Sequence, residues 1–489
     1  MNRMIQLSSN FIWRNIYNLM HKNFLVISRF GFVILLYALY LPFTNYTELY
    51  FDAGQYWNLA FKFFSPSQQF SILNYNESMR GYLAPFMLLP VRVLSHAMSW
   101  NPIVGARVMG VLWAALLFGV AIPIVWKQAV GRQLRNGAWL LIVALGFIFW
   151  RDYFNFPLQD VPALTLLLLA LAAATQRGLG WVMLAGALLA ATLNLRPLYL
   201  ASIPGFLGWL YWQTRYHAKS KLQTSEPQPT KHLVLVMVVL TIGAAIILLP
   251  QLLINYRHFH QVSPLVLTLD NSSMSLYLKQ LNWGMAYQRY ESSISPNHFG
   301  GILYADAIGL QQLQGQPGGY FSSYTQYINH AVQHPLSMIT RLLRHLFNGM
   351  DLWFATPYPH ELQPASKSIL QLLNYSLISI GIWQLGSWFL LTPSEECRKY
   401  GIAWLLFAIL LPVALTLPTL VESRFLLPLH ILLITVTAAN FHPLQWLRLP
   451  PKRQLLLAAL FVLSIWVAWD ISSSTVQQLL PYGTKPPTY

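Results

Sequence analysis

Charged residues are scarce in this chain. Only 9% of its 489 residues are charged, and the 15 acidic residues are outnumbered by 31 Lys and Arg residues. A typical soluble domain carries about 25% charged residues. The chain is also 55% hydrophobic, with a mean hydropathy of +0.44. These values exclude an ordinary soluble protein and predict a polytopic membrane protein.

Cysteine and the common catalytic motifs are equally sparse. A single cysteine, Cys397, excludes an intramolecular disulfide and leaves the redox compartment open. No phosphate-binding loop, nucleophile elbow or nucleic-acid motif is present, and we expect no metal site among the thirteen histidines. We interpret His258 and His260, beside Arg257, as lining a loop. In a membrane protein, the net charge of +16 fits topology signals and contact with lipid headgroups.

The apolar runs predict an all-α polytopic membrane protein with about eleven transmembrane helices. A helix needs about 20 mostly apolar residues to cross a bilayer. The basic N-terminus and first run suggest a retained signal-anchor, because no small-residue cleavage site follows. The run 181–213 is interrupted by NLRP at 194–197, and we split it into two spans. The expected spans are about 24–42, 105–126, 137–150, 161–175, the two parts of 181–213, 232–254, 367–391, 400–420, 425–440 and 454–470.

Basic residues flanking the runs predict a cytoplasmic N-terminus. The chain then divides into an N-terminal membrane half (1–217) with an outer loop at 43–104, a polar cytoplasmic linker (218–231), and a C-terminal half (232–489) with a large outer loop at 256–365. We expect interfacial helices at 56–64, where aromatic and polar residues alternate, and at 334–347, where Arg341, Arg344 and His345 lie opposite the apolar face. The segment 81–98 fits either a membrane span or a surface helix, and its two prolines and Arg92 favour the surface helix.

With this topology, ionisable residues from distant segments emerge on one side of the membrane. Ionisable groups at a membrane boundary are costly and often functional. They predict an outward-facing polar cleft. The acidic residues among them leave open whether the cleft binds a divalent metal, although no ligand spacing indicates one. No other cofactor is expected. The candidate residues are Asp52, Asp152, Asp160, Arg196, Arg257, Glu422 and Arg424.

Asp52 is the strongest catalytic candidate, because its loop follows the first span directly. A partly desolvated acid has a raised pKa and makes a better general base. The alternative is a helix cap, since Asp52-Ala53-Gly54-Gln55 has capping-box spacing.

The other candidates also have simpler interpretations. Asp152 beside Arg151 fits a local surface pair, and Asp160 before Pro162 fits a helix start. Arg196 and Arg257 fit side chains that reach towards the interface. Glu422 and Arg424 fit a structural ion pair with an acid elsewhere in the cleft.

Six segments form a pattern through their order and spacing, although each is short. They are the first outer loop with Asp52, RVMGVLWAALLFGV (107–120), Asp160 with PALTLLLLALAA (162–173), GALLAATLNLRPLYL (186–200), LLPQLLINYRHF (248–259) and PTLVESRFLLPLH (418–430). Together they resemble the GT-C superfamily of polytopic glycosyltransferases, in particular bacterial relatives of the protein O-mannosyltransferases and of lipid A aminoarabinose transferase.

The resemblance implies a polyprenyl-phosphate-linked sugar donor and transfer on the extracytoplasmic face of a bacterial inner membrane. Asp52 matches the family's general base, and Asp160 a second acid that orients the acceptor or supports the site. Arg424, followed by Arg196 and Arg257, is expected to bind the leaving phosphate. Ala53 stands where the family often has a second acid, and RGYLAPF (80–86) replaces a YPP-type segment. The acceptor class therefore stays open.

Two other functions compete with this one. A lipid-linked sugar flippase would need a polar site near mid-membrane and matched broken helices. A membrane glycan polymerase or ligase would place its chemistry in the 256–365 loop, for instance at Arg289, His298 or Arg341.

Overall fold

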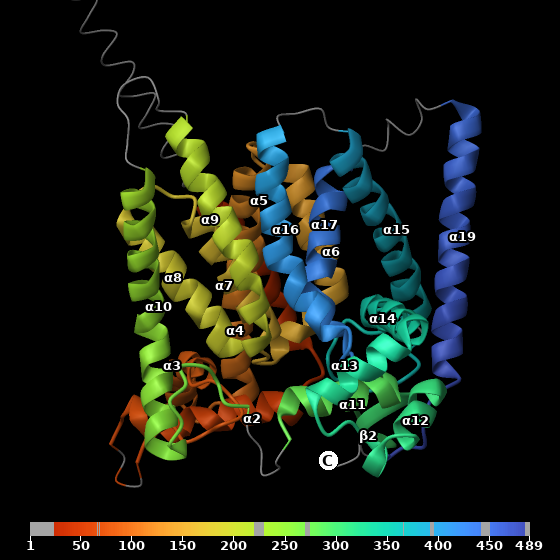
Figure 1. Ribbon diagram of the computed structural model, residues 1–489, viewed down its shortest axis with the longest axis horizontal. Helices are drawn as coiled ribbons and strands as arrows, with labels where there is room; N and C mark the ends of the chain where they lie inside the picture. The colour runs from red at the N-terminus through yellow and green to blue at the C-terminus, as the bar shows by residue number, and fades with distance from the viewer. Residues whose placement is uncertain are drawn as a thin grey trace, which may run out of the picture.

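The protein is mostly helical and has two layers in the computed structural model. Residues 24–65, 67, 69–219, 229–268, 274–364, 366–391, 396–441 and 450–484 are described. Apolar helices stand side by side as a bundle, and shorter elements form a second layer across one end of it (Figure 1). The first outer loop therefore lies in the same layer as the large loop from the second half.

The bundle consists of the long apolar helices and their shorter neighbours. Along its length it contains Phe24–Phe43, α4 (Pro102–Ala114), η4 (Ala115–Ala121), α5 (Ile122–Val130), α6 (Asn136–Trp150), α7 (Asp160–Ala173), α8 (Leu179–Leu195), α9 (Ser202–Lys219), α10 (Pro229–Phe259), α15 (Lys367–Leu391), α16 (Glu396–Thr416), α17 (Leu427–Ala439) and α19 (Pro451–Val476).

Six helices of the described chain are long and apolar enough to cross a membrane. They are Phe24–Phe43, Pro102–Val130, Asn136–Asn155, Leu233–Phe259, Lys367–Ser387 and Pro451–Val476. Five further apolar helices have only 10–17 residues. The protein therefore has the helices of a membrane protein, but the expected count of eleven spans is not confirmed. The helix does break at Arg196, where α8 ends and the short helix η6 (Pro197–Ala201) follows.

Helix α7 is at the centre of the bundle. Every residue of α7 except Leu169 is buried, and the helix packs against α5, α8, α9 and α17. Helices that are apolar on all sides belong in such interior positions. Asp160, its first residue, is consequently held at the boundary between the bundle and the second layer.

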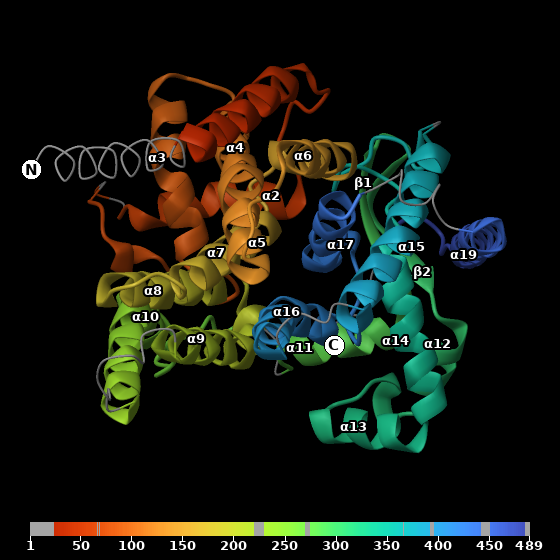
Figure 2. The same cartoon turned by 90° about the horizontal axis from the view of Figure 1, so that it is seen from above.

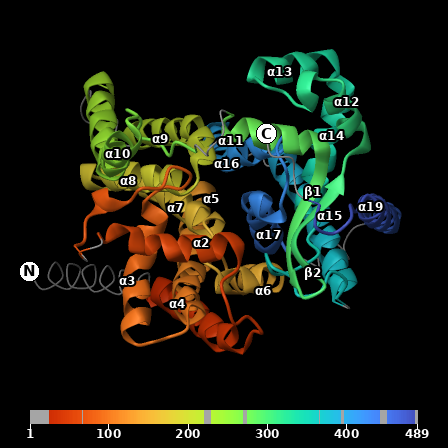
Figure 3. The ribbon, with the colours of Figure 1, turned by 90° about the horizontal axis from the view of Figure 1, so that it is seen from below.

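The second layer consists of the two outer loops. The 43–104 loop forms α2 (Phe51–Leu59), η2 (Ala60–Phe63), η3 (Ile72–Asn74) and α3 (Leu83–Ala97). The 256–365 loop forms α11 (Leu276–Ala286), β1 (Tyr287–Ser295), β2 (His298–Ala305), α12 (Ala307–Gln314), η7 (Pro317–Gly319), α13 (Tyr324–Gln333) and α14 (Pro335–Met350). Figures 2 and 3 show the two groups on different sides of the bundle. Two further short helices connect the layers, η5 (Arg151–Asn155) and η8 (Ser423–Leu426).

The prediction of an all-α chain is wrong in one place. Strands β1 and β2 form an antiparallel hairpin, which pairs Arg289 with Tyr304 and Ser295 with His298. Its polar and aromatic residues lack the apolar periodicity that identifies a strand in sequence. A two-stranded hairpin is marginal alone, and this one is supported by packing against α11 and α14.

The segment 334–347 does form a helix, but its orientation differs from the prediction. Arg341 and His345 are buried in the protein, whereas Leu336, Ile339 and Leu343 are more than half exposed. Arg341 is buried because its guanidinium bonds to Asp306 (3.1 Å). A buried ion pair therefore reverses the face that sequence amphipathicity would place inside.

Some predictions cannot be followed in the structure. The linker at 218–231 coincides with the ends of α9 and α10, and its residues 220–228 lie outside the described part of the chain. The same holds for the basic N-terminal residues before residue 24 and for the side chain of Cys397.

Candidate functional site

Asp52 belongs to the first turn of α2 and does not cap it. The N-cap residue is Tyr50, and it makes no side-chain capping hydrogen bond. Phe51, directly before Asp52, has φ of +43°, a conformation that is strained for a bulky side chain. Such strain is often found beside functional residues. The capping-box interpretation is therefore wrong, because the carboxylate is engaged elsewhere.

Two arginines from distant parts of the chain bind the Asp52 carboxylate. Nη2 of Arg80 donates to Oδ1 (2.8 Å), and Nη2 of Arg424 donates to Oδ2 (3.0 Å). The Asp52 side chain is 35% exposed, whereas that of Arg424 is 12% exposed. The carboxylate thus bridges the first outer loop and the connection between α16 and α17, and it is still partly open to solvent.

These contacts determine the acidity of Asp52. Burial alone would raise the pKa of its carboxyl group, but the guanidinium groups of Arg424 and Arg80 outweigh it and lower the pKa to about 2. The expectation of a raised pKa is therefore wrong for the free site. Asp52 is ionised at neutral pH, and it becomes a stronger base only when a ligand draws the arginines away.

Arg424 also pairs with Glu422. Its Nε lies 2.7 Å from Oε2 of Glu422, and its Nη2 donates to Oε1 (3.1 Å). Burial raises the pKa of Glu422 despite the attraction of Arg424. One arginine is thus shared between two carboxylates, and its contact with Asp52 is an ion pair with an acid from a distant segment, as the sequence suggested.

A second ion pair lies beside the first. Nη1 of Arg196 is 2.7 Å from Oδ1 of Asp160, and this carboxylate is 6% exposed. The guanidinium groups of Arg196 and Arg424 lie 4.8 Å and 5.5 Å from the ring centre of Phe425. Phe425 therefore separates the two pairs, and the structure brings five predicted residues together: Asp52, Asp160, Arg196, Glu422 and Arg424.

Arg80 is the site residue that the sequence analysis missed. Its backbone is fixed by the next residue, Gly81, because a Cβ there would lie 2.1 Å from the backbone oxygen of Asn194. Its guanidinium also donates to Gln55 and lies 4.5 Å from the ring centre of Tyr56. The pairing of Arg80 with Asp52 depends on the fold of the loop, since the two residues are 28 positions apart in the chain.

Buried amides hold this loop against the bundle. Asn194 accepts from the backbone N–H of Leu83 (3.0 Å) and donates to Gln251 (2.9 Å). Gln251 in turn donates to Asn255 (2.9 Å), which donates to the backbone oxygen of Ser263 (2.7 Å). All three amide side chains are at most 2% exposed. In the sequence, this network is marked by Asn194 in the apolar run of α8 and by Gln251 and Asn255 in that of α10.

An aromatic cluster forms around Phe51, the residue before Asp52. The ring of Phe51 lies 5.2 Å from Phe299 and 5.5 Å from Tyr358. Tyr358 also packs edge-on against Phe156 at 4.8 Å. Phe299 is 65% exposed on the β-hairpin. The site therefore combines a carboxylate, several guanidinium groups and an apolar rim.

The remaining predicted residues lie elsewhere. Asp152 accepts from Tyr40 (2.8 Å) and lies 3.9 Å from Nε of Arg151, so it forms a local cluster. Arg257 is exposed on the last turn of α10, and the neighbouring His258 bonds to the backbone oxygen of Leu73. Within the described residues, no group of three or more His, Cys, Asp or Glu side chains could hold a metal ion.

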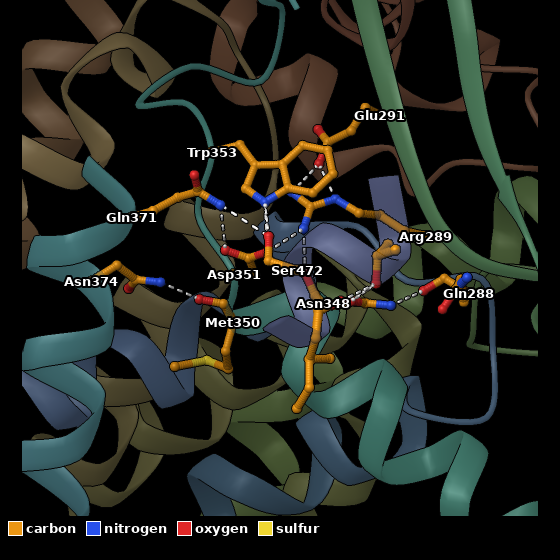
Figure 4. A network of polar contacts seen from close by, with 12 residues as sticks. Gln288, Arg289, Glu291, Asn348, Met350, Asp351, Trp353, Gln371, Asn374 and Ser472 are labelled. Carbon is orange, nitrogen blue, oxygen red and sulfur yellow. Dashed lines mark hydrogen bonds and ion pairs between the residues drawn. The ribbon is translucent and has the colours of Figure 1, made fainter. Parts of the chain in front are cut away.

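A second polar network lies beneath the β-hairpin (Figure 4). Arg289 donates to Glu291 (2.6 Å) and to the backbone oxygen of Asn348 (2.9 Å), and its Nη1 is 3.6 Å from Asp351. Asp351 also accepts from Ser472 of α19 (2.6 Å). Arg289 is 1% exposed. This network joins the hairpin to the bundle, and it leaves Arg289 inaccessible to a substrate.

No protein-family model matches the chain, and no curated protein is significantly similar to it.

Proposed function

We propose that the chain is a membrane glycosyltransferase that uses a polyprenyl-phosphate-linked sugar. The observation that supports this most is the Asp52 carboxylate between the guanidinium groups of Arg80 and Arg424, in the layer beside the apolar bundle. Transfer from a lipid phosphate requires a base for the acceptor and positive charge for the leaving group. This arrangement contains both within one cluster.

In the proposed reaction, Asp52 accepts the proton of an acceptor hydroxyl. The acceptor oxygen forms a bond to the anomeric carbon as the bond from that carbon to the phosphate oxygen breaks. The electron pair of the broken bond stays on the phosphate, which Arg80 and Arg424 stabilise. Guanidinium groups suit this role because they form paired hydrogen bonds to phosphate oxygens.

Donor binding would also activate the base. In the free site, the two arginines keep the pKa of Asp52 at about 2, which makes it a weak base. A phosphate that attracts the same guanidinium groups weakens their hold on the carboxylate and raises its pKa. The base therefore becomes effective only when the donor is bound, which limits contact between a strong base and water.

The roles of the surrounding residues follow from their positions. Asp160 holds Arg196 beside Phe425, so that a third guanidinium lies near the phosphate site. Glu422 orients Arg424, and the exposed ring of Phe299 provides an apolar rim for the acceptor.

The finer architecture is part of the same proposal. We infer about eleven crossings in a GT-C-like arrangement, with the short helices α7, α8, α16 and α17 among them. The basic flanks favour a cytoplasmic N-terminus and an extracytoplasmic site, in a bacterial inner membrane.

The test is to incubate the purified protein, in lipid nanodiscs, with polyprenyl-phosphate sugars labelled in the sugar. Release of labelled sugar to an acceptor or to water supports the proposal. The flippase alternative requires the opposite result in proteoliposomes, namely movement of the intact donor across the bilayer without cleavage of the sugar–phosphate bond. That result would overturn the proposal.

A further inference from the structure

Helices α13 and α14 carry an apolar surface that nothing in the described chain covers. Successive exposed residues are spaced three or four apart, so each helix has one apolar row. The rows meet at the turn around His334, and their members are 44–80% exposed: Tyr324, Ile328, Val332, Leu336, Ile339 and Leu343.

This surface also lacks formal charge. Between residues 324 and 343 the only Asp, Glu, Lys or Arg residue is Arg341, and it is 3% exposed. Its guanidinium donates to Asp306, to Gln312 and to the sulfur atoms of two methionines. Water-exposed surfaces of proteins normally mix charges with apolar residues, and they rarely leave a continuous apolar patch uncovered.

The position of the two helices indicates what covers their apolar rows. They lie at the height of the lower ends of α15 and α19 (Figure 1), and α13 is at the outer rim of the molecule (Figures 2 and 3). The surface continues into the bundle. The ring of Tyr324 is 6.4 Å from Tyr277, whose hydroxyl donates to the backbone oxygen of Leu415 in α16 (2.9 Å).

We propose that α13 and α14 are embedded in the membrane interface, with these two rows in contact with lipid acyl chains. The buried Arg341–Asp306 pair makes this possible, because it turns the charged side of α14 into the protein and the apolar side outward. Tyr324, the first residue of α13, is exposed at the kind of boundary that tyrosine side chains favour. This inference does not depend on the chemistry proposed for Asp52.

The experiment uses the full chain in which Cys397 is replaced by Ser, reconstituted in nanodiscs. A single cysteine at Val332 or Leu336 (V332C, L336C) is labelled with an environment-sensitive fluorophore. Gln314→Cys, at an exposed polar position that ends α12, is the matched control. Ile339→Cys replaces L336C if that variant does not fold.

We expect nitroxide groups on the lipid acyl chains to quench the V332C and L336C probes several-fold more strongly than the Gln314→Cys probe. Iodide in the buffer should quench them several-fold less. Equal access of iodide to all three probes would overturn the proposal, because the rows would then face water. Shielding of V332C and L336C from both quenchers would overturn it too, because a protein surface would then cover the rows.

Discussion

Asp52 is bound by two guanidinium groups that would also attract a phosphate. Its low pKa in the free site and its proposed role as a base are compatible only if these groups change partner. The same contacts explain why a charged residue is stable next to an apolar bundle, since buried charges need a partner. Changes to the arginines should therefore affect donor binding and base strength together.

Replacing Arg80 tests the phosphate contact. Loss of a hydrogen bond to a charged group costs about 1.5–3 kcal/mol, or roughly 10- to 100-fold in Kd. We expect Arg80→Gln to weaken donor binding by this amount, measured by titration of a labelled polyprenyl-phosphate sugar. Lys62→Gln is the matched control, because Lys62 is a cation of the same outer loop that pairs with Glu77 (3.2 Å). Equal affinities of the two variants would contradict this role.

The pH dependence of stability tests the Asp52 contacts. The pKa of Asp52 is about 2 in the folded protein, below its ordinary value of 3.8, so ionised Asp52 stabilises the fold. This contribution is complete above the unfolded-state pKa and is lost as the pH falls towards the folded-state pKa. The Tm of the wild type should exceed that of Asp52→Asn at pH 5–7, and the difference should shrink from about pH 4 to pH 2. A difference independent of pH would contradict the contacts.

At the scale of elements, buried amides connect the outer loop to the bundle. Asn194, Gln251 and Asn255 come from α8 and α10, and they fix the loop that carries Arg80. Each amide needs its neighbour, because an unpaired buried polar group is costly. The position of one site residue thus depends on polar residues inside two apolar helices.

Gln251→Leu tests this connection. It leaves Asn194 and Asn255 each without one buried partner, which should cost about 1–3 kcal/mol of stability. We expect a lower Tm and a higher KM for the donor, because the Arg80 loop loses an anchor. Thr241→Val on the exposed side of the same helix, where the hydroxyl of Thr241 donates to the backbone oxygen of Met237, should change neither. A Gln251→Leu variant that behaves like Thr241→Val would contradict the anchoring role.

The sequence predicted the positions of the helices better than the contacts between residues far apart in the chain. Apolar runs identified most helices of the bundle and the break at Arg196, because apolar length is a local property. The β-hairpin and the reversed face of α14 depend on partners far away in the chain, such as Asp306 for Arg341. Five candidate residues do come together, but the pairing of Arg80 with Asp52 required the fold of the first outer loop.

At the scale of the molecule, the two outer loops meet over one end of the bundle. The site takes Asp52 and Arg80 from the first loop and Arg424 from the second half, so both membrane halves are needed to form it. The proposal also requires this layer to face away from the cytoplasm. Orientation is therefore the main property to establish for the whole chain.

Labelling of cysteines in intact cells tests the orientation. In a chain with Cys397 replaced by Ser, Glu48→Cys in the first outer loop and Arg132→Cys between α5 and α6 are both at exposed positions. A membrane-impermeant maleimide should label Glu48→Cys before lysis and Arg132→Cys only after it. The reverse pattern would place the site in the cytoplasm.

The most direct test of the central claim is sugar transfer by Asp52→Asn in nanodiscs, with donor binding measured on the same preparation. Asparagine cannot accept the proton, and a general base contributes about 10²- to 10⁴-fold in rate. We predict a folded variant that binds the donor at least as tightly as the wild type, because Arg80 and Arg424 are released, and whose turnover falls by a factor in this range. Turnover close to that of the wild type would contradict the assignment of Asp52 as the base.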